Sequence, residues 1–348
     1  MSASPINFLS VCSGIEAASM AWEPLGWKAC AFAEIEKFPS AVLAHHWPET
    51  PNLGDMTKHN DWPTKLAPNL IVGGTPCQAF SVAGLRKGLA DPRGNLTLVF
   101  LGILAQFRPR WVVWENVPGV LSDKTGAFGA FIGGLGELGY GVAYRVLDAQ
   151  HFGVPQRRRR VFVVGCLGDW KRAAAVLFEP ESLRGDSPPS REAREKTAGT
   201  LSTRPIPIHD KTTRHAGATG KGSGNGLGVG KPGDPCPTLT AGDKHAVAFE
   251  TRIARNGRGS PSEVCPSLKA QSSGDASPCI ATTTAVRRLT PKECERLQGF
   301  TDDHTLIPWR GKAAENCPDG PRYKALGNSM AVPVMRWIGE RISKLNNI

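Results

Sequence analysis

The stretch FLSVCSGIE (residues 8–16) is an apolar strand pattern that runs into a glycine turn and then into a helical pattern. Gly14 lets the backbone of that turn approach a ligand closely at the N-terminus of the helix. Glu34 lies 20 residues further on, at the end of the next apolar run, and this spacing suits a carboxylate that holds a ribose diol. Only one glycine of a G-x-G-x-x-G pattern is present, so the stretch also fits an ordinary strand-to-helix turn. The missing glycines count against a dinucleotide, whose pyrophosphate needs that cradle.

The alternation of strand and helix continues through residues 1–170. The expected buried strands are Phe8–Val11, Lys28–Ala33, Leu70–Val72, Trp111–Trp114, Val142–Leu147 and Val161–Val164, and expected helices include Ala17–Trp22, Pro39–Trp47 and Leu96–Phe107. This order predicts an α/β fold of βαβ units with a parallel sheet. Ligands of such sheets sit beyond the carboxyl ends of the strands, so residues that follow a strand are the candidates for chemistry.

Composition changes after Trp170. Residues 171–285 are rich in Gly and Pro and poor in aromatic residues, which predicts an irregular segment that buries little apolar surface. Regular structure returns at RRLTPKECERLQGF (287–300), where Thr290 and Glu293 form a capping-box pattern and Gly299 ends the helix. A last helix is expected over about Pro333–Lys344. We therefore expect a first domain part at 1–170, an insert at 171–285 and a return to the first domain at 286–348.

The overall composition narrows the class of protein. The chain has 348 residues, 40% of them hydrophobic and 21% charged, which excludes a wholly disordered or fibrous protein. No apolar run approaches the roughly 18 residues of a membrane span, and the N-terminus lacks the basic region of a secretory signal. The nine cysteines include no C-x-x-C pair, so we expect no metal site, no disulfide framework and a reducing cytoplasm. The net charge of +11 favours a polyanionic partner such as nucleic acid.

Three more segments could carry chemistry. In GGTPCQAFS (73–81), Cys77 follows a strand on a glycine-containing loop, where a thiol of lowered pKa is nucleophilic. In WENVPG (114–119), Glu115 ends the next strand, and its carboxyl group either stays protonated through partial burial or caps the following turn. The run QRRRR (156–160) leads into a strand, so alternation sends Arg158 and Arg160 to one side and Arg157 and Arg159 to the other.

Taken in this order, the four segments resemble the DNA cytosine-5 methyltransferases, as do RRLTPKECERLQGF and YKALGNS (323–329). The resemblance implies a Rossmann-like methyltransferase domain that binds S-adenosylmethionine, with a small, irregular, mostly β target-recognition domain at 171–285. It implies methyl transfer to carbon 5 of a flipped-out cytosine in double-stranded DNA.

The resemblance also implies roles for individual residues. Cys77 would be the nucleophile that adds to carbon 6, Glu115 would act at the N3 edge of the cytosine, and Arg160 with Arg158 would hold the base. The residues expected to bind the cofactor are Ser13, Gly14, Ile15, Glu34, Asp55, Met56, Pro76, Leu96, Asn328 and Ser329. Those expected to contact DNA are Gln78, Ser81, Arg157, Arg252, Arg255 and two candidate Thr-Leu pairs, Thr200-Leu201 and Thr238-Leu239.

The chain departs from the family at the cofactor turn. The family usually has an aromatic residue at the position of Cys12 and glycines at the positions of Glu16 and Ala17. Two alternatives stay open. One is a relative that methylates cytosine in tRNA, and the other is a DNA-binding protein whose cofactor site has decayed. For the enzyme we expect a monomer in the cytoplasm of a bacterial or phage-infected cell, at the nucleoid, either beside a separate restriction endonuclease or alone.

Overall fold

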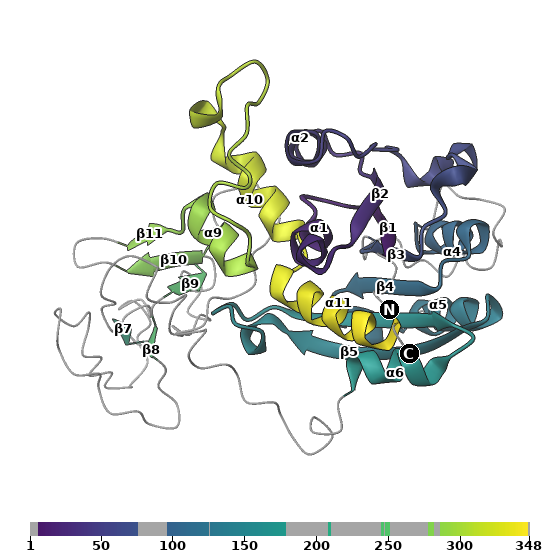
Figure 1. Cartoon of the computed structure of the whole chain (residues 1–348). Coiled ribbons are helices and arrows are strands. Elements are labelled where there is room, and N and C mark those ends of the chain that lie inside the picture. Colours follow the sequence, from purple (N-terminus) through teal and green to yellow (C-terminus); the bar gives the residue numbers. More distant parts are fainter. Residues whose placement is uncertain are drawn as a thin grey trace.

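The computed structural model describes residues 6–75, 96–124, 126–178 and 289–346 in full, and the backbone of short strands between 208 and 288. A six-stranded sheet crosses the larger part of the molecule in the order β2-β1-β3-β4-β6-β5 (Figure 1). Its strands are β1 (Asn7–Val11), β2 (Lys28–Ala33), β3 (Leu70–Gly73), β4 (Trp111–Asn116), β5 (Tyr140–Asp148) and β6 (Arg159–Leu167). The α/β class is confirmed.

The direction of β6 differs from the expectation of a parallel sheet. Strands β1 to β4 are parallel, whereas β6 runs antiparallel to both β4 and β5. Residues 149–158 join β5 to β6, and a parallel crossover needs a dozen or more residues, usually with a helix. Because the connection is this short, the chain turns back on itself. The start of β6 therefore lies at the same edge of the sheet as the end of β4.

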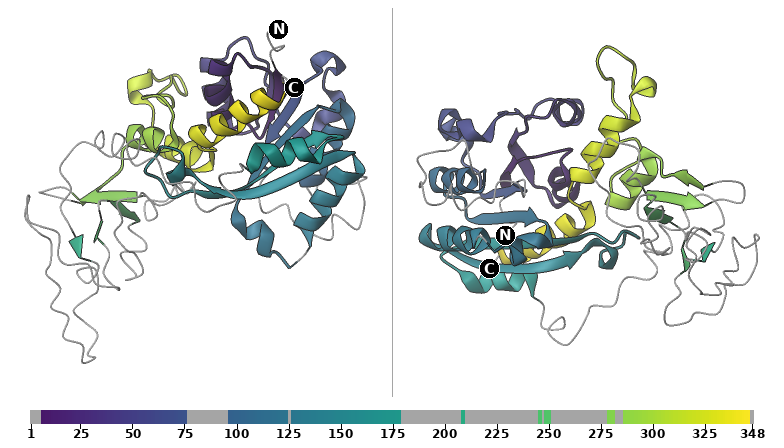
Figure 2. Two further views of the ribbon diagram at one scale, coloured as in Figure 1. Left: turned by 60° about the horizontal axis from the view of Figure 1, so that its bottom comes forward. Right: turned by 180° about the vertical axis from the view of Figure 1, so that it is seen from behind.

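Helices cover both faces of the sheet, as the two further views in Figure 2 show. On one face, Phe8, Leu70 and Val113 pack in a cluster that includes side chains of the first and last helices. On the other, Leu9, Ile71 and Val112 pack against the middle helices. The helices that contribute side chains to the first cluster are α1 (Ala17–Trp22), α2 (Lys37–His46), α6 (Trp170–Leu177), α9 (Pro291–Gln298), α10 (Asp319–Asn328) and α11 (Val332–Asn346). Those that contribute to the second cluster are α4 (Leu96–Phe107) and α5 (Ala127–Glu137).

The C-terminal helix α11 packs on α1, at the other end of the chain. The indole Nε1 of Trp22 donates a 2.7 Å hydrogen bond to the carbonyl of Met335. A Cβ atom on Gly339 would lie 2.5 Å from Trp22 Cδ1, so this close approach requires glycine. The capping box of α9 is confirmed, since Glu293 N donates to Thr290 Oγ1 and Thr290 N donates to Glu293 Oε2.

Short antiparallel strands lie in and beside the segment expected to be irregular and mostly β. Strands β9 (Ala248–Glu250), β10 (Pro278–Ala281) and β11 (Val286–Arg288) form one sheet, and β7 (Ile208–His209) pairs with β8 (His245–Ala246). The division of the chain at residues 170 and 285 stays a prediction. Within the described ranges, no helix is both long enough and apolar enough to cross a bilayer.

Candidate active site

The turn after β1 lies at the carboxyl edge of the sheet. Cys12, Gly14 and Glu16 all have left-handed backbone angles, with φ of 52°, 58° and 66°. The hydroxyl of Ser13 donates to the Ser10 carbonyl at 2.9 Å and accepts a hydrogen bond from Ala33 N at 3.2 Å. These bonds fix the turn against the end of β2.

Glu34 joins the turn to the start of α2. Its Oε2 accepts a 2.8 Å hydrogen bond from Gly14 N, and its Oε1 accepts a 2.7 Å bond from Glu36 N. Burial raises the pKa of Glu34, and these backbone hydrogen bonds oppose the shift. Glu34 therefore contacts the glycine turn directly, and its expected contact with a ribose diol stays a prediction.

Cys12 is a half-buried neutral thiol. Its Sγ lies 3.5 Å from Met56 Sδ, and burial raises the pKa of Cys12 to about 12. Met56 is buried, and Asp55 before it caps the following turn by accepting from Thr57 N at 2.9 Å. Two sulfur atoms thus pack together where the family usually has an aromatic ring.

Glu115 and Arg160 meet at the edge where β4 ends and β6 begins. Arg160 Nε lies 3.0 Å from Glu115 Oε1. Burial is the largest influence on Glu115 and raises its pKa, while the positive charges of Arg160 and Arg158 oppose this. The carboxyl group therefore holds its proton to a higher pH than an exposed glutamate does.

The arginine run alternates as the sequence predicts. Arg158 is 3% exposed and Arg160 is partly buried, whereas Arg157 and Arg159 are exposed. Arg158 Nη2 donates to the carbonyls of Gly327 at 3.1 Å and Ser329 at 2.6 Å. Arg158 thus binds the segment that ends α10, and Arg160 is the arginine in direct contact with Glu115.

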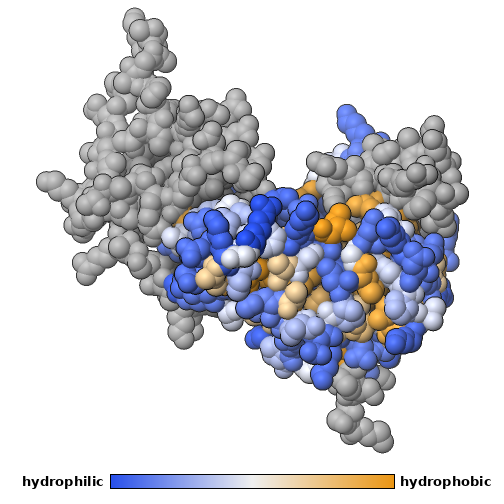
Figure 3. Space-filling model, turned by 90° about the horizontal axis from the view of Figure 1, so that it is seen from above, coloured by the Kyte–Doolittle hydropathy of each residue, from blue (hydrophilic) through white to orange (hydrophobic). Residues whose placement is uncertain are grey.

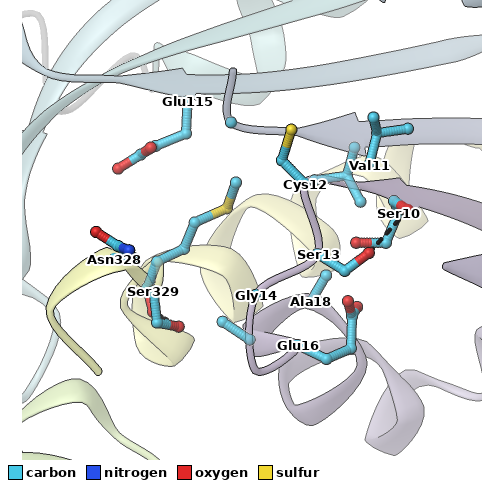
Figure 4. A pocket seen from close by; sticks show the side chains of 14 residues that line it. Ser10, Val11, Cys12, Ser13, Gly14, Glu16, Ala18, Glu115, Asn328 and Ser329 are labelled. Carbon is cyan, nitrogen blue, oxygen red and sulfur yellow. Dashed lines mark hydrogen bonds between the residues drawn. The ribbon is translucent and has the colours of Figure 1, made fainter. Parts of the chain in front are cut away.

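One pocket is lined by the turn after β1, by Glu115 and by the end of α10 (Figure 4). The turn after β1 forms one wall, Glu115 forms another, and the end of α10 closes the third side. The lining residues include Ser10, Cys12, Ser13, Gly14, Glu16, Gly74, Glu115, Asn328, Ser329 and Met330. Of the residues expected at the cofactor, Ser13, Gly14, Asn328 and Ser329 line it, while Ile15, Glu34, Asp55, Met56 and Leu96 lie outside its lining.

The sequence model of the family described as C-5 cytosine-specific DNA methylase matches residues 6–344. The chain belongs to this family. A Type II methyltransferase of Shigella sonnei, M.SsoII, is 31% identical over 89% of this chain and 72% of that protein. A protein of Escherichia phage P1 named DNA N-6-adenine-methyltransferase is 38% identical over 96% of this chain. This chain spans only 61% of that phage protein's length.

Solved structures support the same methyltransferase fold. Dnmt2 of S. pombe superposes with a TM-score of 0.61 at 17% identity, covering 98% of this chain and 99% of that one. A putative DNA modification methyltransferase encoded within an E. coli prophage gives 0.57 at 18% identity, covering 99% and 100%. At such low identity the likeness establishes the Rossmann-like fold alone.

The structure places further residues beside Glu115 that the sequence patterns did not indicate. A Cβ atom on Gly74 would lie 3.3 Å from Glu115 Oε2, so this glycine leaves room for the Glu115 carboxyl group. Asn116 Nδ2 donates to the Thr75 carbonyl at 2.9 Å, and Trp114 Nε1 donates to Thr75 Oγ1 at 3.1 Å. The paired glycines were the signal for Gly74; nothing in the sequence pointed to Thr75.

Several expected methyltransferase residues lie outside the described part of the chain: Pro76, Cys77, Gln78, Ser81, Thr200, Leu201, Thr238, Leu239, Arg252 and Arg255. Burial raises the pKa of Cys12, Cys30 and Cys166, which makes each a poor nucleophile at neutral pH. Among the described residues, no group of three or more His, Cys, Asp or Glu side chains could hold a metal ion.

Proposed function

We propose that this chain methylates carbon 5 of cytosine in double-stranded DNA, with Cys77 as the nucleophile. The observation that carries the proposal is the pocket in which Glu115, paired with Arg160, faces the glycine turn and the Asn328–Ser329 segment. A carboxyl of raised pKa and a cofactor-type turn in one pocket suit a reaction that activates a base beside a methyl donor.

The residues that line the pocket suit S-adenosylmethionine. Gly14 offers a backbone close to the N-terminus of α1, and we propose that Glu34, which lies outside the lining but accepts from Gly14 N, holds the ribose diol. Asn328 and Ser329 provide polar groups on the opposite side. When bound, S-adenosylmethionine supplies an electrophilic methyl group on a positively charged sulfur. Cys12 lines the pocket where the family usually has an aromatic residue, so this side chain offers no aromatic face to the adenine.

Carbon 5 of cytosine is a weak nucleophile, and covalent addition makes it a stronger one. The Cys77 thiolate forms a bond to carbon 6, while Glu115 donates a proton or a strong hydrogen bond to N3, and the electron pair moves to carbon 5. Carbon 5 would then bond to the methyl group, and the sulfonium sulfur would keep the electron pair of its broken bond to that group. Loss of the carbon 5 proton to water restores the double bond, breaks the bond between Cys77 sulfur and carbon 6 and releases the thiolate, and a proton held at N3 returns to Glu115.

The position of Thr75, two residues before Cys77, supports this role for Cys77. Trp114 and Asn116, on either side of Glu115, hold Thr75 by hydrogen bonds. Cys77 follows Thr75 by two residues, which is about 7 Å of chain at full extension. The guanidinium of Arg160, beside Glu115, would lower the pKa of a nearby thiol and stabilise charge at the base O2.

The base must leave the duplex to reach this pocket, and phosphate contacts must offset the few kcal/mol that extrusion costs. We propose that residues 171–285 form the target-recognition domain that makes such contacts, inserted between the two parts of the catalytic domain at 1–170 and 286–348. The candidates for DNA contacts remain Gln78, Ser81, Arg157, Arg252, Arg255 and the pairs Thr200-Leu201 and Thr238-Leu239. We propose that the enzyme acts as a cytoplasmic monomer at the nucleoid, either beside a separate restriction endonuclease or as an orphan.

Adenine methylation is the second candidate, because the phage P1 relative carries an adenine-N6 name. That relative extends well beyond the 61% matched by this chain, and the family model that covers the chain is the cytosine one. Cytosine in DNA is therefore the favoured substrate.

The test is to incubate the full chain with S-adenosylmethionine and unmethylated duplex DNA, and to measure modified nucleosides by mass spectrometry. The expected product is 5-methyldeoxycytidine, absent when Cys77→Ser replaces the native chain. N6-methyldeoxyadenosine as the product would contradict the proposal. A product found on tRNA but not on DNA would favour the RNA alternative.

A further inference from the structure

A second hollow of about 640 Å³ lies beside the candidate active site. Its walls are the start of α2 (Ile35–Pro39), the loop that carries Trp309–Lys312, and α10 up to Asn328. Asn328 also lines the active-site pocket, so the two hollows adjoin at this residue. We call this second hollow the α2–α10 groove. In the view from above in Figure 3, much of the visible described surface is hydrophilic.

The α2–α10 groove is lined by apolar side chains, including Phe38 and Trp309, and by basic ones. Trp309 packs edge-on against Phe38, with ring centroids 5.2 Å apart, which holds its indole in place. Among the lining residues, Lys37, Arg310, Lys312 and Lys324 are positive and Glu36 alone is negative. Lys324 pairs with Glu36 at 2.9 Å, so the positive charges of Lys37, Arg310 and Lys312 remain in excess over acidic groups of the lining.

A tight turn presents Arg310 and Lys312. Trp309 N donates to the Lys312 carbonyl at 3.0 Å, and Lys312 N donates to the Trp309 carbonyl at 3.1 Å. The two residues between them, Arg310 and Gly311, both have positive φ, at 51° and 75°. Such a turn favours Asn or Asp at its first central position, so arginine there costs backbone energy. The guanidinium of Arg310 lies over the Trp309 ring, 5.4 Å from its centroid, which holds this positive charge beside the groove.

We infer that the α2–α10 groove binds the sugar-phosphate backbone of the DNA that flanks the target cytosine. Exposed Arg and Lys side chains on a rigid turn suit phosphate groups, which position a duplex without reading its sequence. The groove adjoins the active-site pocket, so a duplex with its target base in that pocket has flanking phosphates close by. This inference rests on the proposed function, because it takes DNA as the substrate.

The test uses the full chain with Arg310→Asn and Lys312→Gln together. Asparagine tolerates the left-handed angle at position 310, so the turn and the fold are retained. Binding to a duplex of about 40 base pairs is followed by fluorescence anisotropy across a range of salt concentrations. Each lost phosphate contact lowers the slope of log affinity against log salt by about 0.9. We expect a slope lower by about 2 and an affinity roughly tenfold weaker at low salt.

The matched control removes two positive charges at the opposite edge of the sheet, through Lys28→Gln and Lys171→Gln. Both lysines are exposed, Lys28 at the start of β2 and Lys171 in the first turn of α6 after β6. The control is expected to keep the native slope and affinity. S-adenosylmethionine binding, measured by titration calorimetry, is expected to be the same for the native chain and both variants.

Two outcomes would overturn the inference while leaving the proposed function intact. One is a native salt slope in the groove variant when the native chain binds and methylates DNA. The other is weaker S-adenosylmethionine binding with an unchanged salt slope, which would assign the groove to the cofactor. Failure of the native chain to bind or methylate DNA would instead contradict the proposed function, and the inference with it.

Discussion

Arg160 Nε lies 3.0 Å from Glu115 Oε1, and the antiparallel direction of β6 brings the two residues together. In the sheet register Glu115 is opposite Phe162, so Arg160 lies just beyond the paired end of β4. The positive charge opposes the burial that raises the pKa of Glu115. The pair thus sets the pH range over which the carboxyl group can donate a proton.

Removing the charge of Arg160 should shift the pH profile of the reaction. Without the guanidinium, the pKa of Glu115 rises further, so the loss of activity at alkaline pH should move to higher pH in Arg160→Gln. Measurement of kcat/KM against pH tests this, with Arg159→Gln as the control because that side chain is exposed. An alkaline limb in Arg160→Gln that matches the native one would contradict the coupling.

Glu115→Gln should lower kcat by roughly 10²–10⁴-fold at every pH.

Arg158 should act on stability and cofactor binding together. Its guanidinium bonds the carbonyls of Gly327 and Ser329, which flank Asn328 of the pocket. In Arg158→Met these buried carbonyls lose their donor, at a cost of roughly 1–3 kcal/mol each in the free energy of unfolding. We also expect weaker S-adenosylmethionine binding by calorimetry, with Arg159→Met unchanged in both measurements. Native cofactor affinity in a destabilised Arg158→Met would show that the bonds serve the fold alone.

The sequence predicts the site well where the relationship is local. Alternation within QRRRR separates Arg158 and Arg160 from their exposed neighbours, and the turn after β1 brings Gly14 to Glu34. The partners of Arg158 lie far along the chain, at 327 and 329, and no local pattern indicates them. For the same reason Thr75, held by groups of β4, was not expected at the site.

In the fold too, the features set by local sequence could be predicted and those set by distant contacts could not. The bounds of β2, α1 and α4 agree with the apolar patterns, because each pattern is continuous and clearly bounded. Helix α5 has the sequence AFGAFIGGLGE, whose glycines have a low helix propensity. The sequence therefore does not indicate this helix, which tertiary packing stabilises. The direction of β6 could not be predicted from periodicity, since an apolar strand pattern is the same in both directions.

Glu16 should make the native chain less stable as the pH rises. It occupies a left-handed position, is 1% exposed, and accepts hydrogen bonds from Ser19 N and Oγ at 3.0 and 3.1 Å. Burial raises the pKa of Glu16 from 4.5 to about 7, so the folded state binds the proton more tightly than the unfolded state. Stability is therefore full below about pH 4.5 and falls by up to ~1.4 kcal/mol per pH unit as the pH rises towards 7.

Denaturant unfolding of Glu16→Gln across this range tests the assignment. The glutamine keeps an oxygen that accepts from Ser19 and carries no charge, so its stability should not show this decline. At pH 8 the free energy of unfolding of Glu16→Gln should exceed that of the native chain. Parallel stability curves for the two proteins would show that Glu16 does not titrate as described.

His304 should produce the opposite slope at lower pH. Its Nε2 lies 2.9 Å from the carbonyl of Ile15, and its ring stacks on His46 with centroids 4.2 Å apart. Burial lowers the pKa of His304 from 6.5 to about 4, so the unfolded state takes up the proton first as the pH falls. Stability should therefore be full above about pH 6.5 and be lost at up to ~1.4 kcal/mol per unit towards pH 4.

The difference between the native chain and His304→Gln isolates this group from other titrating residues. The native chain should lose more stability than the variant between pH 6.5 and 4. His59→Gln is a control, because His59 hydrogen-bonds Gln106 away from the cofactor turn. Equal losses in the native chain and His304→Gln would contradict the assignment.

The most direct test of the central claim is bisulfite sequencing of DNA from cells that express either the native chain or Cys77→Ser. We expect cytosines protected in one short sequence context with the native chain and none with the variant. Equal protection with both chains would show that Cys77 is not the nucleophile. Complete conversion with both, while the native protein is folded and present, would contradict cytosine-5 methylation itself.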